Sequence, residues 1–110
     1  MVKFMIIFKT PNDPAAFGDR YADFLALIER MPEVARRQVV DILGSPLGTT
    51  NFHRILEVYF ADQDALNRSL MSAAGQEAGS EIGKFAPGSV DLLIAEVYEE
   101  QGGSTPQGAS

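Results

Sequence analysis

The sequence of 110 residues contains no cysteine and has a single histidine, His53. The absence of cysteine excludes disulfide bonds, thiolate metal sites and cysteine nucleophiles. One histidine is too few for a histidine-rich zinc or iron centre within one chain. If the protein is an enzyme, the sequence therefore predicts chemistry without a bound metal.

Positive charge is also scarce, since 9 lysine and arginine residues stand against 15 aspartate and glutamate residues, for a net charge of −6. This acidic balance repels phosphate backbones and anionic membrane surfaces, so we expect neither nucleic acid nor membrane as a partner. No stretch approaches the roughly 20 apolar residues that span a bilayer. No cleavage site of small residues follows the short apolar start. We therefore expect a cytoplasmic protein.

Hydrophobic residues make up 45% of the chain, which is enough for a buried core. A chain of this length is close to the common size of one domain, so we predict a single domain over residues 1–100. Residues 101–110 are small or polar, with nothing large to bury. We predict that they form a flexible C-terminal tail.

The segment Phe52–Phe60 is the stretch around which we expect the fold to be organised. Its aromatic and β-branched side chains suit a pleated, largely buried strand. Because successive strand side chains point to opposite faces, the even-numbered residues should share one face and the odd-numbered residues from His53 to Tyr59 the other. Both faces carry apolar side chains, so we predict a strand in the middle of a sheet with a cover on each side.

The remaining elements follow from apolar periodicity and turn residues. Strands are predicted at residues 2–9, 34–43 and 89–99, and helices at residues 15–31, 63–71 and 73–85. Asp13 and Pro14 should start the first helix, because Asp caps free N–H groups and Pro fits the first turn. The strand at 34–43 carries several charges, which are typical of a sheet edge.

This order of elements predicts an α+β, ferredoxin-like βαββαβ fold with a four-stranded antiparallel sheet and helices on one face. The strands at 2–9 and 52–60 should be the central pair. Without a cover, their second face would be an apolar patch larger than soluble proteins usually expose. We therefore expect a homodimer with two-fold symmetry, packed sheet on sheet.

Three glycines, Gly75, Gly79 and Gly83, are spaced four apart and so lie on one side of the last predicted helix. Each glycine inside a helix costs about 1 kcal/mol relative to alanine. The spacing indicates either a weak, partly frayed helix or the close approach of another backbone or a ligand on that side.

Four segments in this order, residues 2–9, 13–21, 52–60 and 72–88, are similar to segments of a known family. Over about residues 2–98 the chain resembles the EthD family, which belongs to the dimeric α+β barrel superfamily. The resemblance implies a ferredoxin-like subunit that pairs through its sheet into a barrel. It also implies a pocket between sheet and helices or inside the barrel. The superfamily includes cofactor-free monooxygenases, cyclases, lactone isomerases and haem-degrading enzymes.

The chain departs from the family in the middle of the first predicted helix. Many members have a histidine there, followed two residues later by a proline, whereas residues 24–28 contain neither. Chemistry that depends on that histidine in relatives is therefore not open to this chain in the same form. This reduces the weight of an enzymatic interpretation.

His53 and Tyr21 are the candidate catalytic residues. Histidine titrates near neutral pH and is a natural general base for taking a proton from an activated carbon. Tyr21 lies on the stripe of the first helix that should face the sheet, where its hydroxyl can point into a pocket. The structural alternatives are a polar interface residue for His53 and a core tyrosine for Tyr21.

Glu57, Tyr59 and Phe24 are the candidate substrate-binding residues. Glu57 and His53 are about 13 Å apart along a strand, so they can meet only through a ligand or through partners from a neighbouring strand. A buried carboxylate also needs a partner to stay charged. Arg54, on the apolar face, either extends to the sheet edge or holds an anionic ligand.

Two classes of function remain. The first is a cofactor-independent enzyme of oxidoreductase, monooxygenase or cyclase type that acts on a small hydrophobic or aromatic molecule. The second is a non-catalytic dimeric module that binds a small molecule or serves in assembly. Haem binding is a third possibility and would have to use His53 as the axial ligand.

Overall fold

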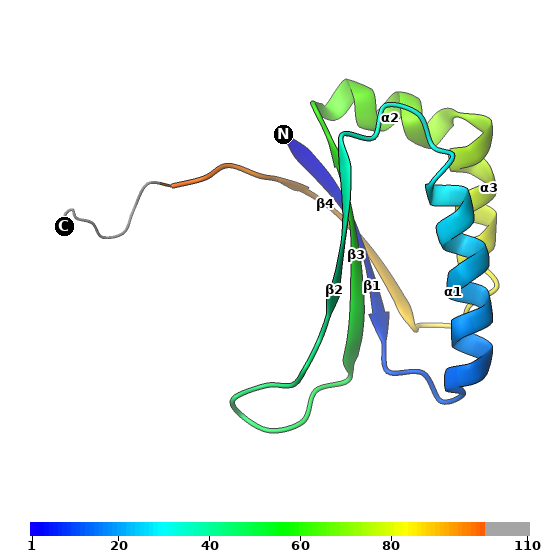
Figure 1. The fold of residues 1–110 in the computed structure, drawn as a ribbon, viewed down its shortest axis with the longest axis vertical. Coiled ribbons are helices and arrows are strands. Elements are labelled where there is room, and N and C mark those ends of the chain that lie inside the picture. Colours follow the sequence, from blue (N-terminus) through cyan, green and yellow to red (C-terminus); the bar gives the residue numbers. More distant parts are fainter. Residues whose placement is uncertain (101–110) are drawn as a thin grey trace.

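The computed structural model describes residues 1–100, so the predicted tail at 101–110 lies outside the described residues. Seven elements follow one another along the chain (Figure 1): β1 (Val2–Lys9), α1 (Pro14–Ile28), β2 (Arg36–Asp41), β3 (Phe52–Phe60), α2 (Gln63–Met71), α3 (Ala73–Ile82) and β4 (Val90–Glu96). None of the helices within residues 1–100 has both the length and the apolar character needed to cross a bilayer.

Three elements, β1, β3 and α2, have the predicted bounds. Helix α1 starts as predicted, because the Asp13 carboxylate accepts a hydrogen bond from the N–H of Ala16 and Pro14 occupies the first turn. It ends at Ile28, three residues earlier than predicted. The N–H groups of Arg30 and Met31 donate to carbonyls three residues back, which tightens the chain into a turn before the next proline. Elements β2, α3 and β4 are also shorter than predicted.

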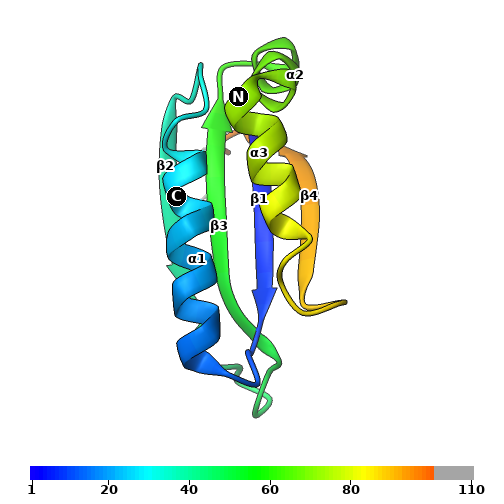
Figure 2. The same cartoon turned by 90° about the vertical axis from the view of Figure 1, so that its right-hand side faces the viewer.

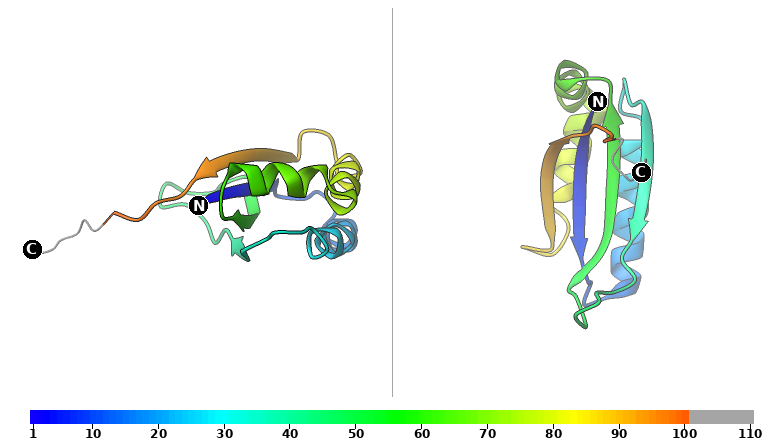
Figure 3. Two further views of the ribbon diagram at one scale, coloured as in Figure 1. Left: turned by 90° about the horizontal axis from the view of Figure 1, so that it is seen from above. Right: turned by 90° about the vertical axis from the view of Figure 1, so that its left-hand side faces the viewer.

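The four strands form one antiparallel sheet in the order β2-β3-β1-β4. The central pair is β3 and β1, and the charged strand β2 lies at an edge, as predicted. All three helices cover one face of the sheet (Figure 1), and the opposite face carries no helix (right-hand view of Figure 3). The predicted α+β ferredoxin-like fold is confirmed.

The core lies between the helices and the even-numbered residues of β1 and β3. Phe8 is at its centre, with its ring centroid within 6.1 Å of four other rings, those of Phe17, Tyr21, Phe24 and Phe85. Most of these pairs are edge-to-face, the arrangement that aromatic quadrupoles favour. Each buried side chain of this size contributes about 1.5–3 kcal/mol through the area it removes from water.

A β-bulge changes the face on which His53 lies. The residues on either side of His53 pair with consecutive residues of β1, so His53 is an extra residue in β3. Its ring lies 5.2 Å from the ring of Phe17 on α1, on the helix-covered side. The prediction that His53 shares a face with Glu57 and Tyr59 is therefore wrong, because the bulge interrupts the alternation on which it relied.

Helices α2 and α3 meet closely at Gly75. A Cβ atom at this position would lie 2.6 Å from the carbonyl oxygen of Leu70 and even closer to that of Ser69, so only glycine fits. At Gly79, by contrast, an added Cβ would meet no atom within 4 Å. Close approach of a second backbone explains the first glycine, and the second borders open space.

Candidate functional site

The predicted site residues fall into two groups on opposite faces of the sheet. Glu57 and Tyr59 lie on the face without helices, which we call the open face. Tyr21, His53 and Phe24 lie between the sheet and α1. The structure therefore does not bring the five residues together around one ligand.

On the open face, the two predicted residues belong to a hydrogen-bonded network. Lys3 Nζ lies 3.1 Å from Glu57 Oε2, and the Tyr59 hydroxyl donates to Glu57 Oε1 at 3.1 Å. Gln38 Oε1 lies 3.3 Å from the same hydroxyl, and the Arg36 guanidinium stacks 4.1 Å from the Tyr59 ring centre. Every carboxylate oxygen of Glu57 has a donor, so this cluster is satisfied without a ligand.

Apolar side chains surround this network on the open face. Those directly opposite Glu57 or in the neighbouring pairs are Met5, Ile7, Val40, Ile55 and Leu93. The β2–β3 loop and the segment after β4 extend beyond this face (Figure 1). Leu43 and Leu47 of the loop are 100% and 98% exposed, and Tyr98 of the other segment is 76% exposed. Within residues 1–100 Leu93, Leu43, Leu47 and Tyr98 are exposed, whereas Met5, Ile7, Val40 and Ile55 are partly buried.

On the helix-covered face, the hydroxyl of Tyr21 is buried and makes no hydrogen bond with the described residues. The Arg54 guanidinium lies 4.7 Å from the centre of its ring. Burial raises the pKa of Tyr21, and the nearby Arg54 charge, which favours the phenolate, offsets only part of this effect. At neutral pH Tyr21 is therefore a phenol that can donate its proton.

Arg54 reaches the edge of the sheet, as one of the two sequence interpretations predicted. Its Nε donates to Asp41 Oδ1 on β2 at 2.6 Å, and this hydrogen bond raises the pKa of Arg54 further. The neighbouring Tyr21 side chain raises the pKa of Arg54 as well, by a smaller amount than Asp41 does.

A pocket of about 580 Å³ lies between α3, α1 and β4, and we call it the α3–β4 pocket. Its lining includes Phe4, Phe24, Ala78, Gly79, Leu92 and Ile94, and none of its lining residues is ionisable. Strand β4 extends beyond the cover of α3 (Figure 2), which leaves Leu92 and Ile94 47% and 52% exposed. Of the predicted residues, Phe24 alone lines this pocket.

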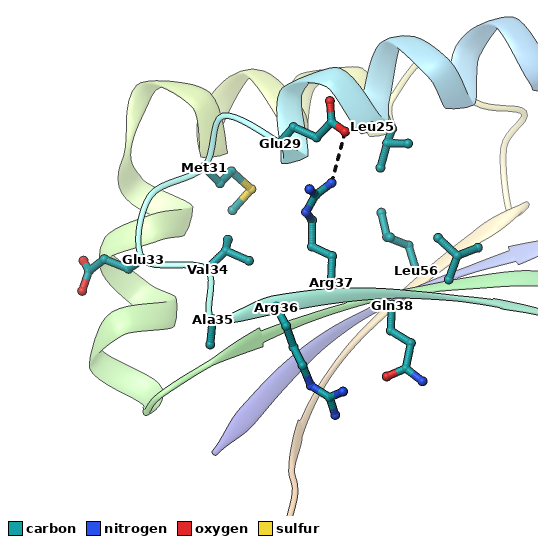
Figure 4. A pocket seen from close by; sticks show the side chains of 11 residues that line it. Leu25, Glu29, Met31, Glu33, Val34, Ala35, Arg36, Arg37, Gln38 and Leu56 are labelled. Atoms are coloured by element: carbon teal, nitrogen blue, oxygen red, sulfur yellow. Dashed lines mark hydrogen bonds and ion pairs between the residues drawn. The ribbon is translucent and has the colours of Figure 1, made fainter.

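A second hollow of about 570 Å³ lies between α1 and β2, and we call it the α1–β2 groove. Four apolar side chains reach into it in Figure 4: Leu25, Met31, Val34 and Leu56. Arg37 spans it, with NH1 3.3 Å from Glu29 Oε2, while Arg36 and Gln38 point away toward the open face. Seen from above, in the left-hand view of Figure 3, the helices and the sheet form two layers. The two hollows are lined by residues of both layers, one hollow beside β4 and the other beside β2.

Sequence reasoning missed both hollows, although it named residues of one of them. The glycine spacing pointed to α3, where Gly79 lines the α3–β4 pocket. Of the residues that line the α1–β2 groove, none had been singled out as a site residue. His53 lines neither of these hollows and instead borders a smaller one beneath the β2–β3 loop. Among residues 1–100, no three histidine, aspartate or glutamate side chains gather as a metal site requires.

No protein-family model matches the chain. A curated relative does match: an uncharacterised 11.0 kDa protein encoded in the thcB–thcC intergenic region of Rhodococcus erythropolis. It is 26% identical over 100 residues, which cover 87% of this chain and 94% of the relative.

Solved structures extend the comparison. A ferredoxin-like protein of unknown function from Jannaschia sp., described as dimeric, has a TM-score of 0.67 at 15% identity, with coverage of 88% of this chain and 100% of that chain. SnoaB, a cofactor-independent oxygenase from Streptomyces nogalater, has a TM-score of 0.64 at 16% identity, with coverage of 93% and 97%. These two similarities show the fold alone.

A stronger similarity links the chain to an EthD family protein from Bacillus halodurans. The TM-score is 0.83 at 29% identity, and the match covers 89% of this chain and 99% of that chain. The resemblance inferred from the sequence is thereby confirmed: the chain is similar to an EthD family protein over most of its length and has a ferredoxin-like fold.

Proposed function

We propose that this EthD-like chain is a homodimeric protein that binds a small hydrophobic or aromatic molecule in the α3–β4 pocket. The observation that carries the proposal is the pocket itself, with a volume of about 580 Å³ and a lining without ionisable groups. Ligand pockets typically have volumes of about 300–1,000 Å³ and mostly apolar walls. A ligand there would also cover Leu92 and Ile94, which otherwise face water.

Gly79 supports this proposal. It lies one turn after Gly75 on α3 and lines the pocket together with Ala78 and Ile82. A side chain at Gly79 would meet no neighbour, so glycine is not needed there for packing. Because a glycine in a helix costs about 1 kcal/mol relative to alanine, its presence lowers stability while it keeps the pocket wide.

The homodimer is proposed to form through the open face. A second copy would cover the apolar side chains around Ile55 and the exposed loop residues Leu43 and Leu47. The Glu57 network could be covered without leaving an unpaired carboxylate, because its hydrogen bonds are made within one chain. The dimeric description of the Jannaschia neighbour is consistent with this arrangement.

A catalytic role is the alternative, and the observation that favours it is the free phenol of Tyr21. In this alternative the chain is a cofactor-independent enzyme acting on the bound molecule, with Tyr21 as proton donor and His53 as base. Binding is better supported, because neither residue lines the α3–β4 pocket. Turnover of an aromatic substrate that is lost in both Tyr21→Phe and His53→Ala would establish the catalytic alternative.

Binding can be tested with N-phenyl-1-naphthylamine, an uncharged aromatic dye whose fluorescence rises in apolar surroundings. We expect the wild-type protein to bind it and Gly79→Leu to bind it at least about tenfold more weakly, since a leucine side chain would occupy the pocket. Gly18→Leu is the matched control, because Gly18 is an exposed glycine of α1 that also borders open space. Both changes raise helix propensity, but only Gly79→Leu places a side chain in the α3–β4 pocket.

Two results would contradict the binding proposal. The first is the absence of dye binding to the folded wild-type protein. The second is equal affinity of the wild type, Gly79→Leu and Gly18→Leu, which would place the dye outside the α3–β4 pocket.

A further inference from the structure

A third pocket, which the proposed function does not use, lies at the end of the sheet where β1 ends and β4 begins (Figure 1). Its volume is about 480 Å³, and we call it the Arg20 pocket. Its walls come from four parts of the chain: the connection from β1 to α1, the first two turns of α1, the end of the β2–β3 loop and the connection from α3 to β4. It shares no lining residue with the α3–β4 pocket.

Hydrogen bonds between these segments hold the walls of the Arg20 pocket together. The N–H and the hydroxyl of Thr10 both donate to the carbonyl of Asn51, at 2.7 and 3.2 Å. The N–H of Lys9 donates to the carbonyl of Ser89 at 2.9 Å, and Lys9 Nζ donates to the carbonyl of Gly88 at 3.0 Å. The chain's own contacts therefore fix the shape of the pocket, which lowers the ordering cost of binding.

Two aromatic rings form much of the apolar lining. Phe85 is buried and Phe17 is half-buried, and their ring centroids lie 6.0 Å apart at an interplanar angle of 58°. The exposed methyl group of Ala16 lies on the same wall as Phe17. A flat aromatic ring can contact both phenylalanines in the offset or edge-to-face arrangements that aromatic groups favour.

The lining also includes three charged side chains, of which two already have partners. Lys9 Nζ lies 3.8 Å from Asp91 Oδ2, in addition to its hydrogen bond with a carbonyl. Asp13 Oδ1 accepts a hydrogen bond from the N–H of Ala16. Arg20 is exposed, and within residues 1–100 its guanidinium has neither a hydrogen bond nor an ion pair. Its N–H groups are the donors that remain for a ligand in this pocket.

Asp13 limits the charge that the pocket can accept. Asp13 and Arg20 are seven residues apart, which places them on the same side of α1 and about 10 Å apart along its axis. An anionic group beside Arg20 is attracted, whereas a second one near Asp13 is repelled. The pocket therefore favours a ligand with one negative charge at one end.

A carboxylate suits the Arg20 end better than a neutral group does. Its two oxygens match the planar fork of a guanidinium, and charge-assisted hydrogen bonds are stronger than neutral ones. We propose that the Arg20 pocket is a second binding site, for a small aromatic molecule with a single carboxylate. The carboxylate accepts hydrogen bonds from Arg20, and the ring contacts Phe17 and Phe85. Its occupation does not depend on a ligand in the α3–β4 pocket.

The role of Arg20 can be tested with 2-naphthoate and its neutral counterpart of nearly equal shape, 2-naphthamide, by isothermal titration calorimetry. We expect Arg20→Gln to weaken binding of 2-naphthoate about three- to tenfold and to leave the affinity for 2-naphthamide unchanged. Arg30→Gln is the matched control, because Arg30 is an exposed arginine just after α1 that does not line the Arg20 pocket. Its affinity for 2-naphthoate should stay within about twofold of the wild type.

Two neighbouring alanines of α1 test the location of the ligand. Ala16→Leu places a larger side chain in the Arg20 pocket and should weaken binding of 2-naphthoate at least about tenfold. Ala15→Leu is the matched control, because Ala15 is also exposed on α1 but does not line this pocket. It should bind 2-naphthoate as the wild type does.

The charge limit set by Asp13 can be tested with naphthalene-2,6-dicarboxylate. The wild type should bind this molecule about three- to tenfold more weakly than 2-naphthoate. Asp13→Asn should remove the difference, because asparagine keeps the helix cap but not the negative charge.

The proposal would be overturned if folded wild-type protein did not bind 2-naphthoate, or if Arg20→Gln weakened both naphthalene ligands equally. Equal losses of 2-naphthoate binding in Arg20→Gln and Arg30→Gln would also overturn it, since they would indicate a general effect of net charge. Gly79→Leu should bind 2-naphthoate normally. A loss there would assign the carboxylate to the α3–β4 pocket, and would leave the proposed function standing while this inference fails.

Discussion

Two tyrosines on opposite faces of the sheet are buried to nearly the same degree, with Tyr59 5% and Tyr21 8% exposed. On the open face, the Tyr59 hydroxyl donates to Glu57, which also meets Lys3. On the helix-covered face, the Tyr21 hydroxyl has no hydrogen-bond partner within residues 1–100, and the Arg54 guanidinium lies 4.7 Å from the centre of its ring. The tyrosine with the unpaired hydroxyl is therefore the one beneath the helices.

This difference indicates which face serves which purpose. A surface whose buried polar groups are already paired can be covered by another protein chain at little desolvation cost. The α3–β4 pocket on the other face has a lining without ionisable groups, which suits a small hydrophobic ligand. These observations support the proposals that the open face serves assembly and that the α3–β4 pocket serves ligand binding.

The largest predicted effect is on dimerisation, and it compares a carboxylate introduced on the open face with one introduced on the helix-covered face. Ile55→Glu puts a carboxylate into the apolar part of the open face, where a second copy would bury it without a partner. We expect the dissociation constant of the dimer to rise at least about hundredfold. Analytical ultracentrifugation over a range of protein concentrations measures this change.

Val39→Glu is the matched control for this prediction. Val39 is also a β-branched residue of the sheet, but it lies on the helix-covered face, in the α1–β2 groove. The Val39→Glu variant should remain as dimeric as the wild type. Equal dissociation of both variants, or a dimer that persists in Ile55→Glu, would contradict the assignment of the open face to assembly.

Smaller effects are expected on the free energy of unfolding when two glycines of α3 are changed to alanine. The two changes should have opposite signs. Gly75→Ala forces a methyl group against the backbone of α2 and should lower the free energy of unfolding by about 1–3 kcal/mol. Gly79→Ala adds a methyl group in open space and should raise it by up to about 1 kcal/mol through helix propensity. Urea denaturation measures both. Destabilisation by both changes would mean that the wall of the α3–β4 pocket is packed rather than open.

The smallest predicted effect is on the pH dependence of stability, to which the ionisation of Tyr21 contributes. Burial raises its pKa in the folded state above the value near 10 of an unfolded chain, so the folded protein holds this proton more tightly. Its contribution to stability is complete below pH of about 10 and is lost as the pH rises further, because the unfolded chain ionises first. Tyr21→Phe should reduce the fall of Tm between about pH 9 and 11.

Tyr98→Phe is the control for the alkaline prediction, because Tyr98 is 76% exposed and its removal should leave the slope of the wild type unchanged. If Tyr21→Phe and Tyr98→Phe had the same slope as the wild type, the phenol of Tyr21 would not be held in a desolvated site.

The sequence was sufficient for the fold because its signals are local. Alternation defined β1 and β3, and the cap at Asp13 marked where α1 begins. The order of strands followed from rules of chain connection, and the charges of β2 placed it at an edge.

The arrangement of the site residues could not be predicted in the same way, because it depends on features that leave no pattern in a short stretch of sequence. The bulge at His53 is a mismatch between two strands, so neither strand shows it alone. The α3–β4 pocket results from how far α3 lies from β4, and the sequence of neither element states that distance. Phe24 was chosen as a ligand contact and does line the pocket, whereas the missing partner of Tyr21 became visible only when α1 was placed on the sheet.

The most direct test of the division between the two faces is a titration of the Ile55→Glu variant with N-phenyl-1-naphthylamine. We predict a monomer of 11.9 kDa that still binds the dye, with an affinity within about threefold of the wild-type dimer. A folded monomer that no longer binds the dye would contradict it, because the pocket would then require the second copy and the two faces would not act separately.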